Sequence, residues 1–472
     1  MKKVSLLFLI ALMVSSTGVY ASGLAIPEQG AAAMGMSAAV TARSEDLSAI
    51  YYNPAGIDYI GKAELFLGFT PIFPTHKFEG ATISKDSNKM SFFPPNVYFA
   101  GRVNERVVFG IGLYTPFGLG TDWDSKWTGR YTSTYGEVRS VYLTPAVSVK
   151  IHDMVSIGAS YSWIWSDAVI KKKIDSGLAI YSATAQQNPA AANPAMIANP
   201  EYDSEFSLDG DGGSVAYTVG LMLRPFERMQ VGLTYKSKTD LEFEGAAKFT
   251  HPSAYNALLS QQMPTFQNGI AELNLPSMVN VGLKYDLTSA WDAEFDLNFV
   301  NWSTYNELVI DLENNLPSDK LIQVKDWEDG MVFRIGTSYD MSEITTFRAG
   351  FLFDQSPVPD ETFDAQLPDN DRIGISVGLG RTVNMGGVPI CIDASYMYLK
   401  FSDRDKDNFV GYQDVGSFDT VNNVPQPGVK DGVIDATDQA IMNGMVGGEY
   451  PVANGTYKSF VNLLSISASY KF

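Results

Sequence analysis

The chain has 472 residues, of which 45% are hydrophobic and 12% aromatic, with a formal net charge of −19 and one cysteine, Cys391. The acidity argues against nucleic-acid binding, which needs a basic surface, and a single cysteine excludes an internal disulfide framework. Beyond the N-terminus no apolar run reaches the length of about eighteen residues that a transmembrane helix needs.

Residues 1–21 have the layout of a secretory signal peptide. Two lysines follow the first methionine, an apolar stretch runs from Val4 to Val14, and small residues precede a cleavage point after Ala21. The alternative is an N-terminal membrane anchor, against which the short apolar stretch argues.

Residues 22–62 differ from the rest of the chain because they are rich in Ala, Gly, Met and Ser and do not alternate with period two. Small residues of low strand propensity favour a compact, partly helical segment over a wall strand. Asn53 precedes Pro54 and Ala55, and an Asn-Pro pair starts a turn after an extended residue. We therefore predict a plug, or hatch, that ends in a rigid polar turn.

Alternating, aromatic-rich segments of strand length follow one another from residue 63 to the C-terminus. About fourteen can be counted: 63–75, 89–103, 106–118, 131–151, 154–170, 213–226, 229–243, 275–285, 290–302, 331–339, 345–354, 372–381, 389–400 and 457–472. The last one is apolar at every other position and ends on Phe472, which is typical of a closing strand.

The connections between these segments alternate between short and long, and the longest are 171–212, 244–274, 303–330 and 401–456. Short inner turns and long outer loops are the pattern of an outer-membrane β-barrel, whose strands need only about 9–11 residues to span the bilayer. We predict an all-β fold: an antiparallel transmembrane barrel, formed by residues 63–472, in the bacterial outer membrane. Its lumen would be too wide for wall side chains alone to fill, so the hatch is expected to plug it.

Motifs in the hatch and the wall together resemble the FadL-type long-chain fatty-acid transporters, a family that includes toluene and xylene importers. The resemblance covers residues 22–472 except 401–456 and rests on these residues: Gly23-Leu24, Glu28-Gln29, Met34-Gly35, Asp46, Tyr52-Asn53-Pro54-Ala55-Gly56, Pro94-Pro95-Asn96, Tyr114-Thr115-Pro116-Phe117-Gly118-Leu119, Trp127-Thr128-Gly129-Arg130-Tyr131, Asp209-Gly210-Asp211-Gly212-Gly213, Arg348-Ala349-Gly350, Ser356-Pro357-Val358-Pro359-Asp360 and Leu367-Pro368-Asp369.

The resemblance implies uptake of a hydrophobic ligand that outer loops capture, a barrel pocket holds, and a gap at a kink in the third strand releases sideways into the membrane lipid. Thr115, Pro116, Phe117 and Gly118 mark such a break, because proline cannot donate to a strand ladder. Unpaired backbone cannot face lipid, so we expect the Asn53 turn to pack behind the break. The alternative is that Pro116 only ends the strand at the outer interface.

Ligand contacts are also implied by the resemblance. Leu24 corresponds to the family's apolar N-terminal residue near the ligand, although it could equally belong to a loose terminus. The family's basic residues match Lys171 approximately after the fifth strand, and Lys325 and Arg334 near the tenth. Lysines at a strand end can instead form a solvated interfacial belt, so the sequence does not separate fatty acids from aromatic hydrocarbons.

Other functional classes fit less well. Gly374 to Gly378 matches the G-x-S-x-G pattern of hydrolases but lies within an alternating segment instead of a strand-turn-helix elbow. A passive porin or an adhesin would not need a plug. We therefore expect a monomeric transporter that is not an enzyme and requires no cofactor.

One further motif lies in the loop 401–456. Asp403, Asp405, Asp407 and Asp414 follow the spacing of a calcium-binding loop, although Asn408 replaces the expected glycine and Asp414 the usual glutamate. Residues 431–438 resemble the second half of another such loop. The alternative is a solvated acidic loop.

Overall fold

A computed structural model describes residues 23–43, 45–81, 83–261, 263–313, 320–408, 410 and 453–472. The predicted signal peptide and most of the loop 401–456 lie outside these residues. Within the described part no helix has the length and apolarity to cross a membrane.

The described strands build one antiparallel barrel, and a closed ring of 14 of them forms its wall. The ring runs in chain order and closes where β1 pairs with β22: β1 (Ala63–Phe69), β4 (Pro95–Arg102), β5 (Val107–Tyr114), β7 (Tyr135–His152), β8 (Val155–Ile174), β9 (Ser204–Phe226), β10 (Met229–Lys236), β13 (Met278–Asp286), β14 (Trp291–Val300), β17 (Gly330–Ser342), β18 (Thr345–Asp354), β19 (Arg372–Met385), β20 (Val388–Phe401) and β22 (Gly455–Lys471). The predicted barrel and its strand number are confirmed.

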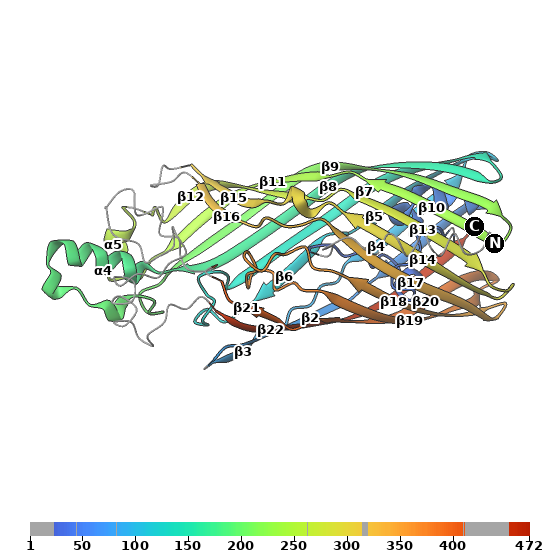
Figure 1. The fold of residues 1–472 in the computed structure, drawn as a ribbon. Helices are drawn as coiled ribbons and strands as arrows, with labels where there is room; N and C mark the ends of the chain where they lie inside the picture. The colour runs from blue at the N-terminus through green and yellow to red at the C-terminus, as the bar shows by residue number, and fades with distance from the viewer. Residues whose placement is uncertain are drawn as a thin grey trace, which may run out of the picture.

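Shorter strands continue the wall toward the loop end, where α4 and α5 lie in Figure 1. They are β2 (Ile72–Glu79), β3 (Ser84–Asp86), β6 (Gly118–Asp122), β11 (Thr239–Thr250), β12 (Phe266–Leu275), β15 (Glu307–Leu312), β16 (Lys320–Val324) and β21 (Arg404–Lys406). The helical segments that follow β1 in the chain are α4 (Ser176–Gln187), η2 (Pro189–Ala191), η3 (Pro194–Met196), α5 (Asn256–Leu259) and η4 (Trp302–Thr304).

The wall presents apolar side chains outward and small polar ones inward. On β8, Ile157, Tyr161 and Trp163 are exposed, whereas Ser160 and Ser162 between them are buried. Because successive side chains of a strand point to opposite faces, this pattern gives an apolar outer surface that suits lipid.

Strands extend further into the predicted outer loops than the sequence pattern indicated. β8 continues to Ile174, β9 begins at Ser204, and β15 and β16 lie within 303–330. These extensions keep one buried face, for example at Phe206 and Leu208 of β9 and at Leu308 and Ile310 of β15. The predicted segment 229–243 also divides into β10 and β11, because one extra residue interrupts its pairing with β9.

Residues 23–62, which we call the hatch, occupy the lumen of the ring (Figure 1). They contain α2 (Ala31–Met34), α3 (Ala49–Tyr52) and η1 (Pro54–Tyr59). α2 contacts β19, β20 and β22, while η1 contacts β5, β7, β8 and β9, so the hatch touches opposite sides of the wall. Wall glycines make room for it, since a Cβ on any of them would lie within 3 Å of a hatch atom: Gly158, Gly220, Gly232, Gly282, Gly336 and Gly350.

Candidate functional site

The third strand of the barrel is interrupted at residues 115–117, which we call the wall break. β5 ends at Tyr114, the last residue paired with β4, and β6 resumes at Gly118 paired with β7. Pro116 lies in the gap, where its missing N–H leaves no ladder bond unmade. Because the strand resumes, Pro116 interrupts it and does not end it.

Apolar side chains pack against β6 beside the break. A Cβ on Gly120 would lie 2.6 Å from Cε of Met90 and 2.9 Å from the ring of Phe92. The wall beside the break is therefore closed by two flexible or rotatable apolar side chains. One backbone bond reinforces this closure, from the Asn88 N–H to the carbonyl of Asp122 at the end of β6 at 2.7 Å, so fewer backbone bonds hold it than hold a strand ladder.

The N-terminal end of the hatch supplies hydrogen bonds to the break. Three bonds join the two segments: the Ile26 N–H donates to Pro116 O at 2.8 Å, the Gly118 N–H to Leu24 O at 3.2 Å, and Gln29 Nε2 to Thr115 O at 2.8 Å. Ala25 and Phe117 consequently face each other as an antiparallel pair. The break in the wall is thus sealed from inside by residues 24–29.

This arrangement corrects the expectation that the turn at Asn53, Pro54 and Ala55 pairs with the break. Asn53 instead donates to the carbonyl of Leu221 on β9 at 3.1 Å, and Ser148 of β7 donates to the carbonyl of Ala55 at 3.0 Å. The turn anchors the hatch to the wall at a different place. The sequence showed that a rigid turn was present but not which wall strands it would meet.

Two adjoining cavities inside the barrel share Tyr51, Lys236 and Met278. The first is bordered by Pro116 and Phe117 of the wall break. Its other lining residues are Tyr114, Tyr142, Ser162, Ala216, Tyr217, Thr218, Ser237, Thr239 and Pro276. Mostly apolar, aromatic walls with a few polar groups are typical of ligand pockets.

The second cavity carries positive side chains and hatch residues. It is lined by Ala25, Pro27, Ala38, Thr41, Tyr52, Asn280, Asn298, Val300, Val332, Arg334, Asp354 and Arg372 besides the three shared residues. Arg334 thus lies at a cavity as expected, although it also donates to the carbonyl of Ser37 at 2.8 Å. Its charge therefore acts both on the lumen and on the hatch.

The other predicted cations lie elsewhere. Lys325 forms a buried ion pair with Asp364 at 2.6 Å, while Lys171 lies 5.5 Å from the ring centre of Tyr135. Its neighbour Lys172 is close enough to Lys325 for their charges to repel. Contact of Lys171 with ligand stays a prediction, and Lys236 was missed because its place facing the lumen depends on the local pairing of β10.

The N-terminal end of the hatch, from Gly23 to Pro27, is tightly packed. Gly23 has a φ of +51°, and a Cβ there would lie 2.6 Å from the rings of Trp302 and Trp327. Leu24 is partly buried against the core, while Ala25 and Pro27 are the residues of this segment that line a cavity. Contact of Leu24 with ligand stays a prediction.

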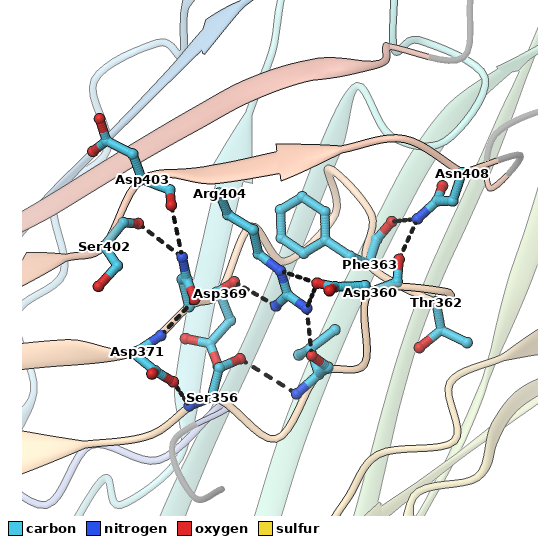
Figure 2. Close-up of polar contacts among 12 residues, drawn as sticks. Ser356, Asp360, Thr362, Phe363, Asp369, Asp371, Ser402, Asp403, Arg404 and Asn408 are labelled. Carbon is cyan, nitrogen blue, oxygen red and sulfur yellow. Dashed lines mark hydrogen bonds and ion pairs between the residues drawn. The ribbon is translucent and has the colours of Figure 1, made fainter. Parts of the chain in front are cut away.

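The start of the loop 401–456 is fixed to the loop 355–371 (Figure 2). Arg404 donates to Asp360 at 2.6 Å and stacks over the Phe363 ring at 4.5 Å, and Asn408 donates to the carbonyl of Asp360 at 2.7 Å. Both loops are therefore tied together at the barrel mouth.

The expected calcium ligands that the structure describes lie in or beside these contacts between the two loops. Asp403 pairs with Lys400 at 3.1 Å and Asp405 accepts a bond from Thr456 at 2.6 Å, in and around the extended β21. Within the described residues no group of three or more acidic, His or Cys side chains could hold a metal. Asp407 is described, but Asp414 and residues 431–438 lie outside the described part, so the calcium loop stays a prediction.

The serine of the hydrolase-like pattern and a buried serine–histidine pair both have structural partners. Ser376 of the G-x-S-x-G match lies on β19 and bonds to Ser37 of the hatch at 2.8 Å. His251 contacts Ser204 at 2.8 Å, but its other ring nitrogen meets the Met263 carbonyl instead of a carboxylate. Ser204 is fully buried, so no substrate could reach it.

Asp175 makes the stability of the outer loop 171–212 depend on pH. Its carboxyl group accepts from the N–H groups of Leu178 and Ala198 at 3.1 and 3.0 Å, capping α4. Burial, followed by the charge of Asp203, raises the pKa of Asp175 to about 7. A carboxyl group with a raised pKa favours the folded loop in its protonated form, so the loop should gain stability as the pH falls from about 7 toward 4.

We expect α4 to exchange its amide hydrogens more slowly at pH 5.5 than at pH 8, after correction for intrinsic rates. Asp175→Asn, which mimics the protonated acid, should remove the difference. The opposite pH trend in the native protein, or an unchanged trend in the variant, would contradict this assignment.

A closed strand ring with an apolar outside, a lumen filled by the chain's own hatch, and a cavity that reaches an interrupted wall strand define a plugged transport barrel. The family described as outer membrane protein transport protein (OMPP1/FadL/TodX) matches residues 12–419, and the chain belongs to this family. Its members are transporters and channels, so the protein is an outer-membrane transporter and not an enzyme.

Individual relatives are distant in sequence and close in fold. The long-chain fatty acid transport protein of Escherichia coli O6:H1 is 24% identical over 84% of this chain and 92% of its own. A crystal structure of a Pseudomonas aeruginosa FadL homologue superposes with a TM-score of 0.76 at 18% identity, covering 96% of this chain and all of its own. The Pseudomonas putida toluene transporter TodX gives 0.66 at 15% identity, covering 96% and 100%.

Proposed function

We propose that the protein imports long-chain fatty acids or similarly hydrophobic molecules and releases them sideways into the outer membrane through the wall break. The observation that carries the proposal is the cavity bordered by Pro116 and Phe117, because it brings an apolar lumen to the interrupted strand. An aromatic hydrocarbon is the alternative ligand, since the relatives include proteins named for each.

The proposed route of the transported molecule begins at the outer loops. A single chain provides the whole route. Leu258 and Phe266 are large apolar side chains that stay exposed at the loop end, where a hydrophobic molecule would first bind. The ligand would then enter the lumen and reach the cavities above the hatch. The ring closes within one chain, which supports a monomer.

Release requires residues 24–29 to leave the break. Their contacts are a few hydrogen bonds, each with a net value of about 0.5–1.5 kcal/mol, so ligand binding can compete with them. A passive porin needs an open lumen. It fits poorly here because the hatch touches opposite sides of the wall and so obstructs the lumen.

A reversible crosslink between the hatch and the break tests this path. Ala25 and Phe117 form an antiparallel pair whose hydrogen bonds lie on the flanking residues. In such pairs the Cα atoms are about 4.5 Å apart, within the range of a disulfide. We expect Ala25→Cys/Phe117→Cys, in a Cys391→Ser background, to lose fatty-acid uptake when oxidised and to regain it on reduction.

The Cys391→Ser parent controls for the redox treatment, and heat-modifiable gel mobility reports folding. Full uptake by the oxidised, crosslinked barrel would rule out exit through this break.

A further inference from the structure

The wall has a second irregularity, where β9 changes its partner from β10 to β11. The ladder between β9 and β10 ends at Thr218 of β9, and the ladder between β9 and β11 begins only at Gly213. In the described sheet, residues 214–216 of β9 consequently have no ladder partner among residues 239–241 of β11. We call this place the β9 gap.

An extra residue and a close approach of two strands explain the β9 gap. The segment that joins β10 to β11 carries one residue more than β9 over this interval, and an extra residue bends its strand. The Ser237 N–H donates to the Tyr217 carbonyl at 2.9 Å and its hydroxyl accepts from the Tyr217 N–H at 3.0 Å, which closes one end of the gap. At the other end, a Cβ on Gly212 would lie 1.9 Å from the carbonyl oxygen of Glu242, a closeness that only glycine permits. The gap is therefore short and bounded at both ends.

The β9 gap and the wall break lie in one row across the sheet. Tyr114, the last residue of β5, is paired with Tyr142 of β7, Tyr142 with Ile164 of β8, and Ile164 with Ser214 at the edge of the gap. Two strands, β7 and β8, thus separate the two interruptions.

The first cavity reaches the β9 gap as well as the wall break. Its lining includes Ala216, Tyr217 and Thr218 on the β9 side of the gap, and Ser237 and Thr239 on the other side. Tyr217 lines the cavity although half of its surface is exposed on the outer face of the wall. The cavity therefore extends into the wall at this place.

Apolar and aromatic side chains surround the β9 gap on the outer face. The rings of Tyr217 and Tyr235 lie 6.0 Å apart, and both residues are exposed, as is Val215. The hatch bonds that seal the wall break go to residues 115–118, on the far side of β7 and β8. Unpaired strand backbone is costly against lipid and is tolerated where it lines a cavity. The gap thus adjoins the first cavity on one side and the lipid-facing surface on the other.

We propose that the acyl chain of a neighbouring membrane lipid inserts through the β9 gap into the first cavity when no transported molecule occupies it. An empty apolar cavity forfeits dispersion contacts, and a lipid tail that enters it exchanges one apolar environment for another. The head group stays outside, because the ladders at both ends of the gap leave room for a chain and not for a whole lipid. This lipid site goes beyond the proposed function and does not depend on which molecule is transported.

Photochemical labelling from the lipid tests the site on the full-length protein in bilayers. The probe is phosphatidylcholine with a diazirine at the middle of one acyl chain, and residue-level mass spectrometry locates the products after illumination. Val215 faces outward and should be labelled in any case. We expect Ser162 to be labelled too, although it is buried, because it lines the cavity beside Ala216. Ser395 should stay unlabelled, because it is buried on β20, which is paired continuously with β19 and β22.

Ala216→Phe should fill the inner side of the gap and lower the labelling of Ser162 at least fivefold, while Val215 is labelled as before and heat-modifiable mobility reports a folded barrel. Ala394→Phe is the matched control, because it adds the same side chain on the outer face of β20 and should change neither signal. An unlabelled Ser162 in the native protein overturns the proposal. So does equal labelling of Ser162 in Ala216→Phe, which would show entry elsewhere, or of Ser395, which would show labelling without a specific path. Fatty-acid uptake enters none of these outcomes, so the crosslink between Ala25 and Phe117 tests the proposed function separately.

Discussion

Gly158→Ala is expected to open the lumen of an otherwise folded barrel. Gly158 lies on β8 against the turn at the start of η1, and a Cβ there would be 2.2 Å from the backbone nitrogen of Ala55 and 2.4 Å from the carbonyl carbon of Pro54. Backbone atoms cannot rotate away as a side-chain end can. Overpacking of this kind costs about 1–3 kcal/mol or more, so the hatch turn should leave its seat on the wall.

Conductance in a planar bilayer measures this effect. The native barrel should be nearly silent, whereas the variant should show open-channel current and reduced fatty-acid uptake. Gly101→Ala is the matched control, because the nearest atom to a Cβ there is the Lys62 carbonyl oxygen at 3.8 Å. Native-like conductance and uptake in Gly158→Ala would mean that the turn is not needed to seat the hatch.

Arg43→Met is expected to loosen the middle of the hatch. The buried Arg43 side chain forms an ion pair with Glu294 at 3.0 Å, another with Asp292, and one with Glu45 of the hatch at 2.6 Å. Glu294 also accepts from the Ala42 N–H at 2.6 Å, so the acids of β14 hold the hatch through both side chain and backbone. Removing one partner of a buried ion pair leaves an unpaired charge and typically costs about 3–5 kcal/mol.

Hydrogen exchange of the amides between residues 40 and 43 should therefore accelerate strongly in this variant, while heat-modifiable mobility still reports a folded barrel. Adding Glu294→Gln should restore part of the protection because it removes a stranded carboxylate. Arg139→Met is the control: Arg139 and its partner Asp167 are exposed, and exposed pairs contribute about 0–1 kcal/mol. Equal exchange in the native protein and Arg43→Met would show that this pairing does not hold the hatch.

The barrel itself could be predicted because its signals are local. Alternation with period two, short and long connections in turn, and a closing strand ending at Phe472 are all readable without knowing which strands touch. The break at Pro116 is also a local signal, since proline removes a donor of the strand ladder wherever it occurs. The membrane class and the plug followed from these local patterns.

The partners across the lumen depended on tertiary structure. The sequence placed a rigid turn at Asn53 but could not show that Ile26 and Gln29, instead of that turn, would meet the wall break. Hatch and wall are joined by contacts between residues far apart in the chain, and no local pattern records such contacts.

The position of cations also depended on register. One extra residue between β10 and β11 moves the inward face from even-numbered residues, such as Thr234 and Lys236, to odd-numbered ones, such as Thr239 and Leu241. A shift of one residue turns a strand side chain to the opposite face, so the sequence determined that this is a plugged outer-membrane barrel, while only the folded register decided which charges its lumen presents.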